Sequence, residues 1–157
     1  MNNAVYTHYP RFEDWPQRLE ALLQEWATKP FVWGETDCFC FAGAAIESLT
    51  GGNPMAEIMP QYDTEAEAYH LLGGSIFFPS IDRSVPMGGM ERFWSFFLGD
   101  PQPVGKAQRG DLVLLEVGGT GSLAAIIDGS GKAAAAMTER RGVLRVKKSL
   151  GYMSWRV

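Results

Sequence analysis

The chain has 157 residues, of which 46% are hydrophobic and 20% charged, so it matches one domain in length and can bury a core without disulfides or metals. Its formal net charge of −4 argues against a nucleic-acid partner, and we interpret the basic run Lys147-Lys148 as solvated strand and turn residues. No apolar stretch approaches the roughly 20 residues that span a bilayer, and no secretory signal pattern opens the chain, so we expect neither a membrane span nor secretion.

The first predicted helix begins after Asp14, which stands at an N-cap position ahead of Trp15-Pro16-Gln17. An early proline and a capping-box glutamine are typical of a helix start. Apolar residues then recur at helical spacing as far as Lys29-Pro30, namely Leu19, Leu22, Leu23 and Trp26. The pattern predicts an amphipathic helix.

The second predicted helix runs from Cys38 to about Thr50, where Gly51-Gly52 ends it. Asp37 is placed to cap its first turn. Because most of its residues are small or apolar, we expect a buried central helix.

Two further helices are predicted before residue 100. One follows the capping box at residues 64–67 and ends at Gly73-Gly74, and the other covers Met90 to Leu98, with residues 75–89 as a loop between them. Phe77-Phe78 and the aromatic residues of 93–97 exceed what one helix face can bury. They indicate either core packing or a hydrophobic patch that docks on another protein.

From Arg109 onward the pattern changes to short strands separated by glycines. The candidates are Leu112 to Val117, Ser122 to Asp128, Lys132 to Met137, Val143 to Val146 and Met153 to Val157. Helices followed by an antiparallel sheet of about five strands indicate an α+β fold. We expect one domain over 1–157, with a helical part at about 1–100 and a sheet part at about 107–157.

Cys38 is the residue that points to chemistry, because it begins the central helix. Free backbone N–H groups and the helix dipole at that place favour the nucleophilic thiolate. The alternative is that Cys38 is only a small buried hydrophobic residue. Cys40 is too close to pair with it, and two thiols supply only half of the ligands that zinc needs, so we expect reduced cysteines, no metal and no cofactor.

Two segments carry a family resemblance. Trp33-Gly34 followed by Asp37-Cys38 resembles the signature of the NlpC-type superfamily of papain-like cell-wall peptidases and amidases, and residues 107–113, with Gly110-Asp111, look like the start of that family's sheet. The resemblance implies a papain-like fold with Cys38 at the nucleophile position.

The chain more closely resembles an uncharacterised phage-encoded branch of this superfamily. The shared stretches are residues 30–38, residues 50–54 and Trp155-Arg156-Val157. The resemblance implies a tail-module protein that is made in the host cytoplasm and resides in the distal tail of the virion. Its implied partners are the tail-tip hub, other phage tail proteins and the host peptidoglycan.

The enzyme pattern is broken at the second strand, where active members carry a histidine. Either Ser122 or Leu123 occupies that position here, and neither side chain can accept a thiol proton near neutral pH. General-base assistance typically contributes about 10²–10⁴-fold to the rate. His70 and His8 are the remaining candidates for a base, and surface roles explain both of them.

Two hypotheses follow from the residues and the resemblance. The first is a structural component of a phage tail tip or baseplate that keeps the fold of a hydrolase without efficient catalysis. The second is an active cysteine amidase or endopeptidase that cleaves peptidoglycan stem peptides during genome delivery, with Cys38 as the nucleophile.

Overall fold

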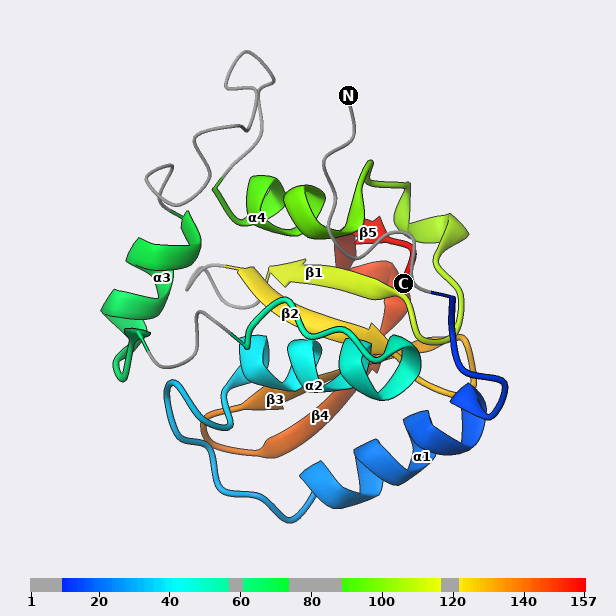
Figure 1. Ribbon diagram of the computed structural model, residues 1–157, viewed down its shortest axis with the longest axis horizontal. Helices are drawn as coiled ribbons and strands as arrows, with labels where there is room; N and C mark the ends of the chain where they lie inside the picture. The colour runs from blue at the N-terminus through cyan, green and yellow to red at the C-terminus, as the bar shows by residue number, and fades with distance from the viewer. Residues whose placement is uncertain (1–9, 57–60, 74–88, 117–121) are drawn as a thin grey trace.

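The computed structural model describes residues 10–56, 61–73, 89–116 and 122–157, in which four helices precede a five-stranded sheet (Figure 1). The helices are α1 (Trp15–Trp26), α2 (Cys38–Thr50), α3 (Glu65–Gly73) and α4 (Gly89–Leu98). The strands are β1 (Leu112–Glu116), β2 (Ser122–Ile127), β3 (Ala133–Thr138), β4 (Gly142–Lys147) and β5 (Gly151–Trp155). Two 3-10 helices, η2 (Val104–Lys106) and η3 (Lys148–Leu150), flank the sheet. The fold is therefore α+β, as the order of the predicted elements indicated.

Helix α1 packs its leucines and Trp26 against the core, and it ends three residues before the predicted limit at Lys29. Asp14 occupies the N-cap position, but its carboxylate makes no capping hydrogen bond. It accepts instead from Arg18 Nε at 2.7 Å, because one turn of helix brings an i+4 arginine within reach. The predicted start is correct and the predicted capping role of Asp14 is wrong.

Helix α2 is the centre of the molecule, with ten of its thirteen residues buried. Gly51 ends it in the left-handed conformation at φ 86°, which glycine adopts without a steric penalty. Gly43 is needed for a different reason, since a Cβ there would lie 2.9 Å from the Met55 side chain. The chain after α2 therefore packs directly onto the helix backbone.

The sheet is antiparallel throughout and has the order β4-β3-β2-β1-β5. One face packs on α2, which crosses β2 and β3 (Figure 1), and its buried side chains are Leu112, Leu114, Ala124, Ile126, Ala135 and Met137. The alternate residues form a second buried cluster on the other face, together with Ala107: Val113, Leu115, Ala125, Ile127, Ala134 and Ala136. The central strands β1 and β2 and the neighbouring β3 therefore have buried side chains on both faces of the sheet.

Strand β5 starts at Gly151, two residues before the predicted start, and ends at Trp155. The β1–β5 register shifts where Leu114 pairs with Met153 and Leu115 with Gly151, so β5 carries one extra residue there, and a Cβ on Gly151 would collide with Val113. Val157 leaves the sheet, and its backbone N–H donates to the Asp111 carboxylate at 3.2 Å.

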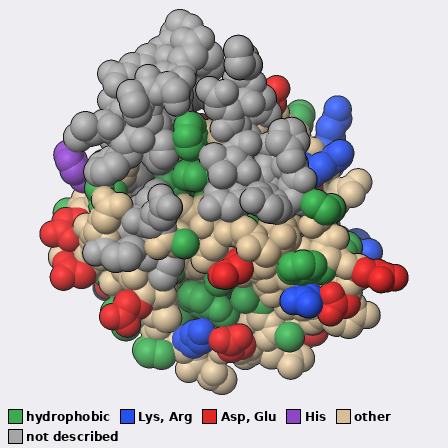
Figure 2. All heavy atoms as spheres, viewed as in Figure 1, with side chains coloured by type: hydrophobic (Ala, Val, Ile, Leu, Met, Phe, Trp, Pro, Cys, Tyr) green, Lys and Arg blue, Asp and Glu red, His purple; other side chains and the backbone are tan. Residues whose placement is uncertain are grey.

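Helices α3 and α4 contact each other, with α4 above β1 and α3 at the left of the sheet in the view of Figure 1. On α4, Phe93 and Trp94 are fully buried and Phe96 and Phe97 are half-buried, so core packing accounts for the aromatic excess of this helix. The predicted loop and Phe77-Phe78 lie outside the described residues. Figure 2 shows acidic side chains gathered along the edge of the molecule that α3 occupies.

Candidate functional site

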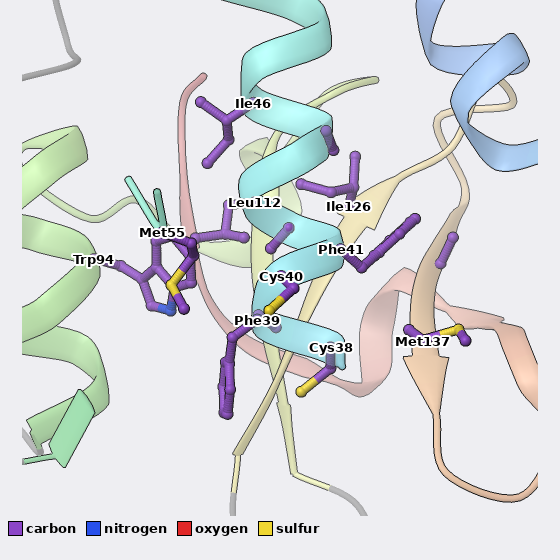
Figure 3. Packing of buried hydrophobic residues seen from close by; sticks show 14 of the residues in the cluster. Cys38, Phe39, Cys40, Phe41, Ile46, Met55, Trp94, Leu112, Ile126 and Met137 are labelled. Atoms are coloured by element: carbon purple, nitrogen blue, oxygen red, sulfur yellow. The ribbon is translucent and has the colours of Figure 1, made fainter. Parts of the chain in front are cut away.

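Cys38 is the first residue of α2, and its side chain is fully buried between the helix and the sheet (Figure 3). Asp37, which precedes it, is also buried and caps the helix: its Oδ1 accepts from the N–H groups of Phe39 and Cys40, each at 2.9 Å. The sequence places a thiol at a helix N-terminus, and the fold encloses that terminus.

The surroundings of Cys38 favour the neutral thiol. Burial raises its pKa far above the usual range, and the adjacent Asp37 carboxylate raises it further. A backbone hydrogen bond from Ala124 on β2 lowers the pKa, but by less than burial raises it. Although Cys38 lies at a helix N-terminus, its thiol therefore stays protonated at neutral pH.

Ser122 and Leu123, the two candidates for the position of the missing base, are the first residues of β2. The Ser122 hydroxyl is hydrogen-bonded to the Tyr152 hydroxyl on β5, and Leu123 packs against both buried clusters. The two candidate residues thus offer a hydroxyl and an aliphatic side chain, and neither is a base near neutral pH.

Tyr69 on α3 connects these two halves of the site. Its ring packs edge-on against Phe39 with 5.7 Å between centroids, and its hydroxyl donates to the backbone oxygen of Ser122 at 3.2 Å. Burial raises the pKa of Tyr69, and proximity to Cys38 raises it further. Tyr69 therefore lies beside the thiol as a neutral hydrogen-bond donor.

His70 follows Tyr69 on the same helix but is exposed, and it lines a hollow of about 310 Å³ on the outer side of α3. The other residues of this hollow are Gln61, Ala66, Glu67 and Leu71. His8 lies outside the described residues. In the described part of the chain no imidazole reaches Cys38.

Cys40, whose role the sequence left open, belongs to a buried network with Asp37 and Tyr62. Tyr62 donates its hydroxyl proton to Asp37 Oδ2 at 2.7 Å, and the same hydroxyl lies 3.4 Å from Cys40 Sγ. Gly34 N–H donates to Asp37 Oδ2 at 2.8 Å. Burial and the Asp37 carboxylate raise the pKa of Cys40 to about 12, so this thiol is also neutral. Sequence reasoning missed Tyr62 and Tyr69, because their partners lie 25 and 53 residues away along the chain.

The Gly110-Asp111 pair, which directly precedes β1, has a structural role. Asp111 is buried and accepts from Arg11 Nη2 at 2.9 Å and from the Gln108 backbone at 2.9 Å. Arg11 in turn donates to the backbone oxygen of Val157 at 2.7 Å. This carboxylate thus ties the segment before α1 to the segment after β5.

Metal and membrane sites are not found in the described residues. No group of three or more His, Cys, Asp or Glu side chains there could hold a metal ion. None of the described helices combines the length and the apolar character that crossing a membrane requires.

Residues 10–157 match the family model described as "Domain of unknown function (DUF6950)". The chain belongs to this family. The match covers Asp37, Cys38, Ser122 and Asp111, so the whole site lies inside the DUF6950 domain. No curated protein matches the chain. Any statement of function for this DUF6950 protein must therefore come from its site and from the motifs of its sequence.

Proposed function

We propose that this protein is a papain-like, NlpC-type domain that has lost hydrolase chemistry and serves as a structural component of a phage tail tip or baseplate. The observation that carries the proposal is the state of Cys38: a fully buried thiol with a strongly raised pKa, whose contact on β2 is the Ala124 backbone and which no imidazole of the described residues reaches.

A cysteine hydrolase needs a thiolate and an open path for the scissile carbonyl. Cys38 lacks the first because burial and Asp37 both favour the protonated thiol. It lacks the second in the described structure, because none of its surface is open to solvent. Restoring only the base would leave the second requirement unmet.

The architecture is consistent with descent from such an enzyme. Cys38 begins a central helix that packs on an antiparallel sheet, and Tyr69 near Cys38 donates a hydrogen bond to the Ser122 backbone oxygen at the start of β2. This arrangement supports the proposal, since the NlpC resemblance expects a nucleophile at the head of the central helix and a base on the second strand. The papain-like assignment rests on that resemblance and on this order of elements.

The tail-tip role rests on the resemblance to the phage branch. That resemblance implies a tail-tip hub protein and other tail proteins as partners. It also implies that the protein is made in the host cytoplasm and resides in the distal tail of the virion. A domain without turnover can be retained there for the surfaces that it offers to neighbours.

Two measurements test the proposal. Purified peptidoglycan is incubated with the wild-type domain and with Cys38→Ala, both checked for folding by circular dichroism, and soluble muropeptides are quantified. We expect no release from either protein; release that disappears in Cys38→Ala would establish the alternative, an active peptidoglycan amidase or endopeptidase.

The second measurement is co-elution of the domain with the hub protein of the same phage on a sizing column. We expect a stable complex that Cys38→Ala forms equally well, since the thiol is buried. A domain that elutes alone with hub proteins present would contradict the structural role.

A further inference from the structure

Charge is distributed very unevenly along this chain. Residues 1–100 contain five Lys and Arg and fourteen Asp and Glu, which gives a net charge of −9. Residues 101–157 contain nine Lys and Arg and four Asp and Glu, which gives a net charge of +5. Because the first part forms the helices and the second forms the sheet, the two signs occupy different regions of the molecule.

Four of the lysines gather at one end of the sheet, where β2 ends, β3 starts and β4 ends. Lys147 pairs with Ala133, and the Lys148 backbone donates to the Lys132 backbone oxygen at 3.0 Å. Lys148 Nζ donates to the Ala107 oxygen at 2.9 Å, next to Lys106 on η2. We call Lys106, Lys132, Lys147 and Lys148 the basic end; none of them forms a salt bridge with a described residue.

An exposed leucine stands two residues beyond Lys148 on the short helix η3. Leu150 is 59% exposed, the highest value among the large hydrophobic side chains of the described residues. An exposed aliphatic side chain flanked by lysines is suited to a partner with an apolar hollow and acidic borders.

Helix α3 offers such a surface at the opposite end of β2. Tyr69 ties α3 to Ser122, where β2 starts, so the six-residue strand, about 20 Å long, separates α3 from the basic end. Asp63, Glu65 and Glu67 are exposed there, and no salt bridge joins them to a described residue. Beside them is the hollow of about 310 Å³ that Ala66 and Leu71 help to line.

We propose that copies of this chain associate head to tail, with the basic end of one copy docked on the α3 hollow of the next. Leu150 enters the hollow, and Lys147 and Lys148 face Glu65 and Glu67. Two different surfaces meet in this contact, so it is heterologous and builds a ring or a short filament instead of a two-fold dimer.

The charges favour a second copy over a polyanion as the occupant. A second copy carries an acidic and a basic surface, so each end of one molecule finds the opposite charge on its neighbour, whereas nucleic acid or an anionic membrane would match the basic end alone and repel the acidic α3 surface. The inference does not depend on the tail-tip role, since it uses only the surface of the domain, and its failure would leave that role intact.

Sedimentation velocity of the full chain from about 1 to 300 µM, at 20 mM and at 500 mM NaCl, tests the contact. We expect assembly that grows with concentration at low salt and is lost at high salt. K147E/K148E and E65K/E67K should each weaken association at least tenfold, and mixing the two variants should restore it, because the mixture again brings opposite charges together.

Matched controls keep the result interpretable. R140E/R141E changes the charge by the same amount on the β3–β4 turn, which lies away from the basic end and at the end of the sheet where α3 lies, so this variant should not weaken association. Circular dichroism shows whether each variant is folded, and L150S probes the apolar contact without a charge change. A wild-type chain that stays monomeric at 300 µM and low salt overturns the proposal. So does a variant mixture that fails to reassociate, or a monomer whose basic end binds heparin or anionic vesicles instead.

Discussion

Asp37 and Asp111 belong to the two motifs that resemble a hydrolase, and each is a buried carboxylate that accepts four hydrogen bonds. The pair that would perform catalysis, Cys38 and the first residues of β2, offers a neutral thiol, a hydroxyl and an aliphatic side chain. The carboxylate of each motif is therefore fully hydrogen-bonded, whereas the residues at the proposed catalytic positions do not form a nucleophile and base pair.

The difference shows which residues of these motifs depend on the fold around them. Buried carboxylates are destabilising unless every lone pair finds a donor, so Asp37 and Asp111 can persist only while the fold around them is intact. A nucleophile carries no such requirement, since Cys38 is stable as a small apolar residue. In this chain the two carboxylates of the motifs therefore stabilise the fold, whereas Cys38 is a neutral buried thiol.

The largest effect should come from Asp37→Ala. It removes the cap of α2 and leaves the Tyr62 hydroxyl and three backbone N–H groups without their acceptor. We expect the free energy of unfolding to fall by about 3–4 kcal/mol in urea titrations. Asp63→Ala, at an exposed carboxylate, is the control and should change it by less than about 0.5 kcal/mol. Equal losses in the two variants would remove the contrast between Asp37 and a surface residue.

Asp111→Ala should cost less, about 2–3 kcal/mol, because its charged partner Arg11 is partly exposed and regains water. The segment before α1 should also detach, since Arg11 would hold only backbone oxygens. Urea titration gives the first effect and faster hydrogen exchange at the Phe12 amide, which donates to Leu49, reports the second. Unchanged exchange at Phe12 would show that Asp111 does not anchor this segment.

The elements were predictable where the signal is local. Proline at the start of α1, Thr64 with Glu67 at the start of α3, and Gly51 at the end of α2 each act within four residues of their position. The site was predictable only as far as Cys38 and its cap.

What could not be predicted depends on contacts between distant segments. Tyr69 meets Ser122, and Arg11 meets Asp111 across 100 residues, so neither pairing leaves a periodic pattern in the sequence. The burial of Cys38 has the same origin, since α2 packs on β2 and β3, which begin more than 80 residues after Cys38 along the chain.

The pH dependence of stability separates Cys38 from an activated thiol. Its pKa is raised in the folded state, so above the unfolded-state value of about 8.5 the unfolded chain loses a proton that the folded chain keeps. Stability is thus complete below about pH 8.5 and falls as the pH rises. Between pH 9 and 10 the wild type should lose about 1.4 kcal/mol per pH unit more than Cys38→Ala, because Cys40 contributes equally to both. Parallel pH profiles from urea titration would indicate a thiol with an ordinary pKa.

Tyr62→Phe removes the hydroxyl that joins Asp37 to Cys40 and leaves the rest of the ring in place. We expect a loss of about 1 kcal/mol in the free energy of unfolding, because Asp37 keeps its three backbone donors. Tyr152→Phe, which removes an exposed hydroxyl bonded to Ser122, is the matched change. A smaller effect at Tyr62 than at Tyr152 would mean that the buried network does not stabilise the fold.

The smallest expected effect is the most informative about catalysis. Replacing Leu123 or Ser122 with histidine puts an imidazole at the position that the proposed NlpC-type fold assigns to the base. Muropeptide release should nevertheless stay at the level of Cys38→Ala, because the thiol remains buried and protonated and a peptide carbonyl cannot reach it. Release by Leu123→His that disappears in Leu123→His/Cys38→Ala would show that the base was the only missing part and that the cover over Cys38 opens in solution.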